Sequence, residues 1–324
     1  MAWSDEPVRV RVPATSANLG PGFDALGLAL TLYDEVEARV TGGGLDIDVT
    51  GEGAGLVGAG EDHLVVSAMR AAFSDMGEQP PGLALRCVNR IPHGRGLGSS
   101  AAAIVAGVLA ARALAGSADP RGALALATTL EGHPDNVAAA LFGGLTIAWV
   151  ERGVARAVGL QPLQGIQPVS IIPPSPVRTE VARGLLPDQV PHQDAAFNSG
   201  RSALLVAALT AHPDMLLDAT ADRLHQDYRA KAMPATWDLV ARLRAVAIPA
   251  VISGAGPSVL AFTSRESSLD QLTAIVDSNA AETGTAWSIS PRDVSRHGAS
   301  ILSASPANPD GGASPDADPS SSGH

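Results

Sequence analysis

Residues 92–102, PHGRGLGSSAA, are the stretch that decides the fold of this 324-residue chain. They form a glycine- and serine-rich turn between a strand predicted over 83–91 and an alanine-rich helix predicted over 99–115. Such a turn presents free backbone N–H groups at the positive end of a helix dipole, where phosphate oxygens bind. Its three glycines let the backbone approach a ligand closely. The stretch therefore predicts a phosphate site, and the alternative is a connector that caps a buried helix.

The loop differs from two well-known nucleotide-binding motifs. It contains no Gly-Lys-Ser/Thr and lacks the G-x-G-x-x-G spacing, so it is neither a Walker A loop nor a dinucleotide fingerprint. Lys231 is the only lysine in the chain. Phosphate chemistry would therefore depend on arginines, backbone amides and a metal ion, which the hydroxyl of Ser99 or Ser100 could help to bind.

Composition indicates a globular protein without nonspecific affinity for nucleic acid. Hydrophobic residues make up 45% of the chain, and the formal net charge of −11 leaves no basic stripe for a phosphate backbone. The single cysteine, Cys87, excludes an internal disulfide and a cysteine zinc site. The N-terminus has no apolar signal core, and the most apolar run, 101–111, is too short to span a bilayer. We therefore expect a cytoplasmic protein with no membrane or nucleic-acid partner.

Hydrophobic periodicity predicts an α+β fold in two domains. In residues 1–160 we expect strands at 8–12, 28–40, 45–49, 83–91 and 142–150, and helices at 64–76, 99–115 and 121–130. Periodicity is lost at 159–167, which marks the boundary. In residues 161–302 we expect strands at 169–172, on both sides of a glycine turn within 250–262, and at 285–289, and helices at 198–211, 214–229, 235–245 and 269–276. The pattern indicates two antiparallel or mixed sheets covered by helices.

The tail, residues 303–324, consists mainly of Pro, Gly, Ser, Asp and Ala. Such a segment cannot bury enough apolar surface to offset the entropy lost on ordering. We expect it to be disordered.

Two polar clusters in the first half could bind a ligand. Asn18 and Asp24 stand among small residues and glycines in 13–24, a composition that suits a tight loop around a small polar molecule. An aspartate is a natural partner for a ligand ammonium, and the alternative is that both side chains only cap turns. The segment 131–136, EGHPDN, offers Glu131 as a carboxylate that could join a serine hydroxyl on Mg²⁺. Its Pro and Asp are also ordinary residues for the start of a helix.

Two arginines in the second half are candidates for binding anions. Arg201 follows Asn198 in the segment NSGR, and Arg229 lies four residues after His225, on the same face of a predicted helix. An arginine can bind a carboxylate or neutralise a phosphoryl group in transfer, and the alternative is a solvated helix face. The glycines of 253–258, SGAGPS, either bring amides to a ligand or make a tight hairpin corner.

Together these segments resemble the GHMP small-molecule kinases, and most closely the members that phosphorylate homoserine. The likeness covers about residues 8–290, and its motifs are the phosphate loop at 91–102, the opening VPATSANLGPGFDALGL at 12–28, and the segments 131–137, 198–204, 225–229 and 253–258. The resemblance implies an N-terminal domain like ribosomal protein S5 domain 2 and a ferredoxin-like C-terminal domain. It also implies an ATP- and Mg²⁺-dependent transferase of threonine biosynthesis.

The resemblance also assigns roles to individual residues. ATP would bind the segment made of Pro92, His93, Gly94, Arg95, Gly96, Leu97, Gly98, Ser99, Ser100, Ala101 and Ala102. Mg²⁺ would be held by Ser100 and Glu131. The amino-acid substrate would contact Asn18, Asp24, His133, Arg201, Arg229, Gly254 and Gly256. In this scheme Asp24 pairs with the substrate ammonium and Arg229 with its carboxylate.

The implied reaction is in-line transfer of the ATP γ-phosphoryl group to the side-chain hydroxyl of L-homoserine, which yields O-phospho-L-homoserine and ADP. No dedicated base is evident, so Asn136 and Arg201 are predicted to orient the hydroxyl and to stabilise charge. Two alternatives stay open: a GHMP kinase for another small alcohol, and a noncatalytic sensor of a nucleotide or amino acid. A homodimer is compatible with all three interpretations.

Overall fold

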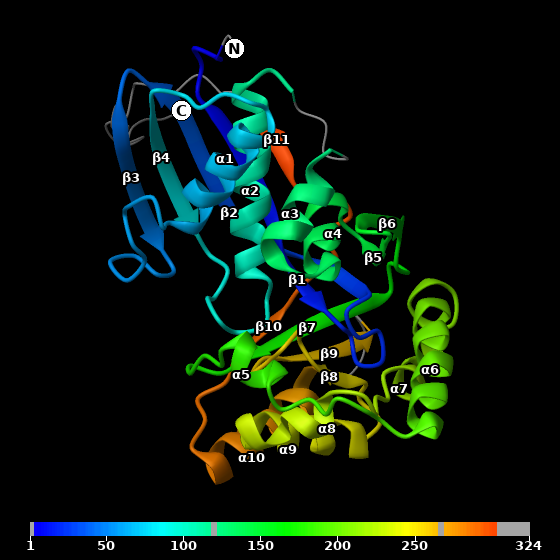
Figure 1. The fold of residues 1–324 in the computed structure, drawn as a ribbon. Helices are drawn as coiled ribbons and strands as arrows, with labels where there is room; N and C mark the ends of the chain where they lie inside the picture. Colours follow the sequence, from blue (N-terminus) through cyan, green and yellow to red (C-terminus); the bar gives the residue numbers. More distant parts are fainter. Residues whose placement is uncertain (1–2, 118–121, 265–268, 303–324) are drawn as a thin grey trace, which may run out of the picture.

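The computed structural model describes residues 3–117, 122–264 and 269–302, so the tail predicted to be disordered lies outside the described residues. Two β-sheets, one above the other in Figure 1, are each packed against helices. This arrangement confirms the predicted α+β class. No helix in the described ranges is long and apolar enough to cross a membrane.

The first sheet has seven strands in the order β11-β1-β2-β4-β3, with β5 paired to β2 and β6 to β5. β3 and β4 run parallel, and the other pairs of this sheet are antiparallel. The strands are β1 (Val8–Ala17), β2 (Leu26–Thr41), β3 (Gly44–Gly51), β4 (Gly82–Asn89), β5 (Leu145–Glu151), β6 (Val154–Leu160) and β11 (Ser300–Leu302).

β1 is longer than predicted. Its residues alternate between buried and exposed up to Val12, and the pairing register with β2 shifts between Pro13 and Ala14. Beyond this irregularity every residue up to Ala17 is buried. The segment predicted to be a tight loop from residue 13 is therefore strand as far as Ala17, and only the turn after it forms a loop.

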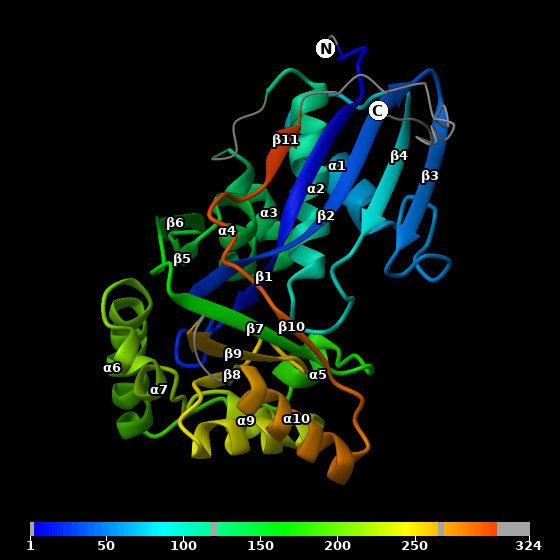
Figure 2. The same cartoon turned by 180° about the vertical axis from the view of Figure 1, so that it is seen from behind.

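Four helices cover one face of the first sheet, as the two opposite views in Figures 1 and 2 show. They are α1 (Leu64–Asp75), α2 (Ser99–Leu114), α3 (Ala123–Glu131) and α4 (Pro134–Phe142). α2 contacts both α1 and strands β1 and β2, and its contact with α1 is close: a Cβ on Gly107 would lie 2.5 Å from the carbonyl oxygen of Val65. The strand predicted from residue 142 begins only at Leu145, because α4 continues to Phe142.

The second sheet is antiparallel, in the order β10 (Ser288–Pro291), β7 (Ile166–Ile172), β9 (Val259–Ser264) and β8 (Ala250–Ile252). Helices α9 (Pro234–Ala245) and α10 (Leu269–Thr283) pack on the face away from the first sheet (Figure 1). The remaining elements are α5 (Thr179–Arg183), α6 (His192–Thr210), α7 (Leu216–Ala219), α8 (Gln226–Arg229) and two 3₁₀ turns, Pro213–Met215 and Ala230–Ala232.

The helix predicted over 214–229 is wrong, because the chain there forms a 3₁₀ turn, α7 and α8 instead. The buried Asp222 carboxylate accepts backbone hydrogen bonds from Leu224, His225 and Gln226. An aspartate that bonds to following N–H groups competes with a continuous helix and favours a new start.

The predicted N-terminal domain, residues 1–160, ends at the last residue of β6. Residues 161–165 then lead to β7. After β10 the chain returns to the first sheet, where the Ser295 N–H donates to the Ala29 carbonyl and β11 pairs with β1. Residues 293–302 thus pack with the first sheet, although the predicted C-terminal domain includes them. The division at 160 and 161 stays a prediction.

Candidate active site

The glycine loop that precedes α2 packs tightly against other parts of the chain. Gly94, Gly96 and Gly98 have φ values of 66°, 71° and 70°, which residues with a Cβ disfavour. A Cβ at Gly96 would lie 2.1 Å from the carbonyl oxygen of Ser253, and one at Gly98 would lie 2.0 Å from Thr15 Oγ1. A Cβ at Gly94 would lie 3.0 Å from Pro176 Cβ, so at all three glycines the close neighbour is the protein itself. These contacts hold the loop between β1 and the turn after β8.

α2 begins at Ser99 with no side-chain cap and no acidic residue in its first turn. The first N–H groups of a helix have no partner within the helix and carry the positive end of its dipole. This turn borders a cavity of about 130 Å³, here called the inner cavity, and a second of about 310 Å³, the side cavity. Ser99 and Ser100 line both. The helix start is thus suited to an anion that extends from one cavity to the other.

Some residues of the predicted ATP segment serve the fold instead. Arg95 donates hydrogen bonds to the carbonyl oxygens of Pro173 and Pro174, which ties the loop to the chain after β7. Leu97 and Ala101 are buried in the hydrophobic core. Backbone amides and the two serines are therefore the parts of this segment that a phosphate could contact.

Ser100 and Glu131 meet where α2 begins and α3 ends. The Ser100 hydroxyl donates to Glu131 Oε2 over 2.7 Å, and burial raises the pKa of the Glu131 carboxyl. Mg²⁺ in nucleotide sites takes one or two protein oxygens and completes its shell with phosphates and water. This pair fits that demand. No group of three or more His, Cys, Asp or Glu in the described ranges offers another metal site.

Asn136, in the first turn of α4, is oriented by a residue of β1. Thr15 Oγ1 donates to Asn136 Oδ1 over 2.8 Å, so the amide nitrogen is the group left for the inner cavity, which Asn136 lines. The neighbouring Asp135 also lines this cavity and is 2% exposed. Its Oδ1 accepts the Asn136 N–H over 2.7 Å, and burial raises the pKa of Asp135 to about 7.

Asp24 is paired with an arginine that the sequence analysis missed. Arg183, the last residue of α5, places Nη2 2.7 Å from Asp24 Oδ1 and Nη1 3.3 Å from Oδ2, and it lines the inner cavity. No motif marks Arg183 in the sequence. It reaches the site because residues 173–178, the strap before α5, cross the glycine loop. There the Val177 N–H donates to the Gly94 carbonyl over 3.0 Å.

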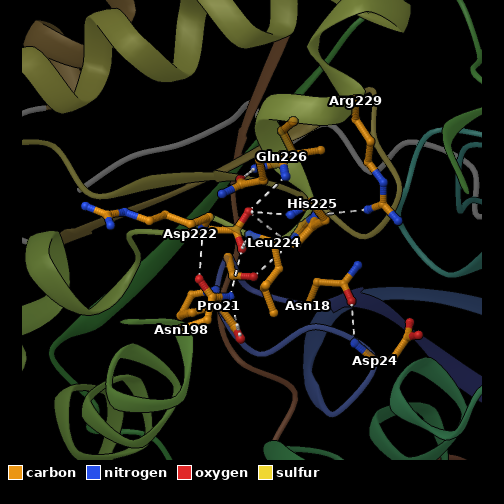
Figure 3. Close-up of polar contacts among 12 residues, drawn as sticks. Asn18, Pro21, Asp24, Asn198, Asp222, Leu224, His225, Gln226 and Arg229 are labelled. Atoms are coloured by element: carbon orange, nitrogen blue, oxygen red, sulfur yellow. Dashed lines mark hydrogen bonds and ion pairs between the residues drawn. The ribbon is translucent and has the colours of Figure 1, made fainter. Parts of the chain in front are cut away.

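Asn18 joins the turn that carries Asp24 to the second half of the chain. Its Oδ1 accepts the backbone N–H of Asp24, and its Nδ2 donates to the carbonyl oxygen of Gly254, both over 2.9 Å. Figure 3 shows the first of these contacts. Asn18 lines the inner cavity, so its amide both shapes the turn and borders the ligand space.

Arg229 is a buried cation with no anionic partner among the described residues. Its side chain lines the inner cavity, yet the residue is only 1% exposed. Nη1 lies 3.0 Å from His225 Nδ1 and 3.2 Å from the Gly254 carbonyl, while Nε has no partner. Burial lowers the pKa of Arg229 to about 10, so the group stays charged at neutral pH. A buried charge without a counter-ion is costly, which indicates that this site is built to receive an anion.

His225 forms a hydrogen bond with the guanidinium of Arg229 (Figure 3). Because Arg229 donates to Nδ1, the ring carries its proton on Nε2, which donates to the carbonyl oxygen of Gly20 over 2.7 Å. The predicted proximity of His225 and Arg229 is confirmed by this contact. Asp222 holds the segment in place, and Asn198 Nδ2 donates to its carboxylate over 3.0 Å. Asn198, on α6, therefore stabilises the position of Asp222. The sequence analysis did not identify Asp222.

The inner cavity brings most of the predicted residues together. Asn18, Glu131, His133, Asn136, Arg229, Gly254 and part of the glycine loop line it. Asp24 and Gly256 do not line it: Asp24 is joined to it through its ion pair with Arg183, and Gly256 packs against Met233, whose Sδ would lie 2.4 Å from an added Cβ. Arg201 does not either: its guanidinium lies 4.9 Å from the centre of the Phe197 ring on α6, at the opposite end of the second sheet from α5 (Figures 1 and 2). The structure brings Arg183 to the cavity and not Arg201.

Comparison with known proteins agrees with this geometry. Two family models match the chain, the GHMP kinases N terminal domain over residues 63–144 and the GHMP kinases C terminal over 200–282. The homoserine kinase of Streptomyces avermitilis is 56% identical over 305 residues, 93% of this chain and 97% of that protein. The chain belongs to the homoserine kinases of the GHMP kinase family.

Further relatives of this GHMP kinase support the same placement. The homoserine kinase of Clavibacter michiganensis is 56% identical over 79% of this chain and 83% of its own length. The crystal structure of homoserine kinase from Cytophaga hutchinsonii aligns with a TM-score of 0.81 and 26% identity, over 92% of this chain and 98% of that one. The predicted resemblance and the predicted GHMP fold are thus confirmed.

Proposed function

We propose that this GHMP kinase transfers the γ-phosphoryl group of ATP to the side-chain hydroxyl of L-homoserine, which yields O-phospho-L-homoserine and ADP. The observation that carries the proposal is Arg229, a buried guanidinium beside the start of α2 that has no counter-ion in the part of the chain that the structure describes. An amino-acid carboxylate would neutralise this charge, and Asp24 would bind the ammonium. The inner cavity, at about 130 Å³, suits one small zwitterion.

ATP would bind across both cavities. Its phosphates would lie on the first turn of α2, where Ser99 and Ser100 border each cavity. The base would then occupy the side cavity, which His63 and Asn89 line. In this orientation the γ-phosphate would point toward the inner cavity and the polar residues that line it.

Ser100 and Glu131 would hold Mg²⁺ against the phosphates, and the ion would withdraw charge from the transferring group. The Asn136 amide, kept in place by Thr15, would donate to the acceptor hydroxyl and orient it. The hydroxyl oxygen attacks phosphorus in line while the bond to the ADP oxygen breaks, and its proton passes late to an oxygen of the transferred phosphoryl group. Positioning is therefore the main demand on the protein. Arg183 takes the place in substrate binding that the sequence analysis gave to Arg201.

The proposal is tested by incubating the purified protein with ATP-Mg²⁺ and, separately, L-homoserine, mevalonate, galactose and L-serine. Formation of ADP and a phosphate ester with homoserine alone is the expected result. An ester with a different alcohol would identify another GHMP kinase, and no transfer to any alcohol would identify a noncatalytic binding protein.

A further inference from the structure

The Asp24–Arg183 ion pair occupies the place where the proposed substrate would put its own charges. Both side chains are about one-third exposed, at 36% and 32%, and the pair is bidentate, with its shorter contact at 2.7 Å. Asp24 is the carboxylate that would bind the substrate ammonium. In the structure it is already neutralised by a residue of the protein.

Arg183 and Arg229 both line the inner cavity, and both lie near the ring of Phe23. The guanidinium of Arg183 lies 5.9 Å from the centre of the Phe23 ring, and that of Arg229 lies 5.6 Å from the same centre. Two cations thus flank one aromatic side chain, and the charge of Arg183 helps to lower the pKa of Arg229. Arg183 Nε is buried without a partner among the described residues. An anion between the two guanidinium groups would relieve their repulsion and satisfy the free donors of both.

We propose that L-homoserine binds by exchanging ion pairs: its ammonium replaces Arg183 on Asp24, and the released Arg183 joins Arg229 on its carboxylate. This inference rests on the proposed function and adds a rule of specificity to it. A ligand with only an ammonium leaves Arg183 without an anion, and a ligand with only a carboxylate leaves Asp24 without a cation. Only a zwitterion replaces both halves of the pair, so the protein rejects singly charged alcohols of the same size.

The test measures dissociation constants by ligand-observed NMR for L-homoserine, 3-amino-1-propanol, which lacks the carboxylate, and 4-hydroxybutanoate, which lacks the ammonium. Wild-type protein is compared with Arg183→Ala, with Arg183→Gln as a second variant that preserves bulk. The control is Arg178→Ala, which removes an exposed arginine just before α5 whose pairing is with Glu180.

Loss of Arg183 is expected to change the affinities for L-homoserine and 3-amino-1-propanol in opposite directions. Loss of Arg183 weakens homoserine binding about tenfold or more, but it strengthens binding of 3-amino-1-propanol about three- to fivefold, because Asp24 no longer has a competing cation. The control changes neither constant. Unchanged or weaker binding of the amino alcohol in both Arg183 variants would overturn the exchange, even if wild-type protein phosphorylates homoserine. Absence of phosphorylation by wild-type protein would instead remove the proposed function.

Discussion

The hydroxyl of Thr15 donates a hydrogen bond to Oδ1 of Asn136 over 2.8 Å, across 121 residues of sequence. A hydroxyl that donates to the amide oxygen determines which end of the amide faces the ligand. In this GHMP kinase the exposed end is the nitrogen, a donor suited to a substrate hydroxyl.

Removing this hydrogen bond should slow catalysis more than it weakens binding. For Thr15→Val, which keeps the shape of the side chain, we expect kcat to fall about fivefold, because loss of one hydrogen bond costs about 1 kcal/mol. The KM for homoserine should stay within about twofold. Steady-state kinetics measure both, and Thr15→Ser, which retains the hydroxyl, should restore most of kcat. Equal rates for the Val and Ser variants would show that Asn136 is oriented by other contacts.

The two arginines on α5 and α6 should differ sharply in their contribution to activity. Arg183→Ala should lower kcat/KM for homoserine about 100-fold, the order expected when a charge-assisted contact of about 2–3 kcal/mol is lost. Arg201→Ala should stay within about threefold, because its guanidinium lies against Phe197. The same assay on both variants decides the matter. A larger loss for Arg201 would restore the role predicted from the sequence.

Metal dependence should report on Glu131. The variant Glu131→Gln keeps an oxygen that Ser100 can contact but removes the charge. The Mg²⁺ concentration that gives half-maximal velocity should therefore rise by at least about tenfold, and EDTA should abolish activity in both proteins. An unchanged magnesium requirement in the variant would show that Glu131 is not a ligand.

Stability should depend on pH through Asp135, whose pKa burial raises from 3.8 to about 7. The folded protein therefore binds this proton more tightly than the unfolded chain does. The contribution of Asp135 to the free energy of unfolding, up to about 4 kcal/mol, is complete below about pH 4. It decreases as pH rises and is lost above about pH 7. Asp135→Asn retains an acceptor for the Asn136 N–H without titrating.

Urea unfolding of both proteins at pH 5 and pH 8 checks this sign. The free energy of unfolding of the wild type, minus that of Asp135→Asn, should be lower at pH 8 than at pH 5. Using the difference cancels the contributions of groups that titrate in both proteins. A difference that is constant, or larger at pH 8, would contradict a raised pKa.

Local features of this chain could be predicted without coordinates. A strand ending at residue 89, a glycine turn and α2 follow one another within a short segment, and neighbouring residues specify each of them. The motifs around Asn18, Glu131 and Arg229 were recognisable for the same reason. Even so, β1 ran further than its alternating residues suggested, because its second half is buried between the sheets and no longer alternates.

The sequence by itself thus determined the α+β fold, the glycine loop before α2 and most residues of the cavity, because each depends on contiguous residue types. Only the tertiary structure decided that Arg183 reaches Asp24, that Thr15 orients Asn136 and that Arg229 lacks a counter-ion among residues 3–117, 122–264 and 269–302. Charge pairing and burial depend on which distant segments pack together. Because Arg183 and Arg201 have the same side chain, residue type alone does not distinguish them. Their difference is one of position: the strap before α5 crosses the glycine loop, whereas α6 lies at the far end of the second sheet.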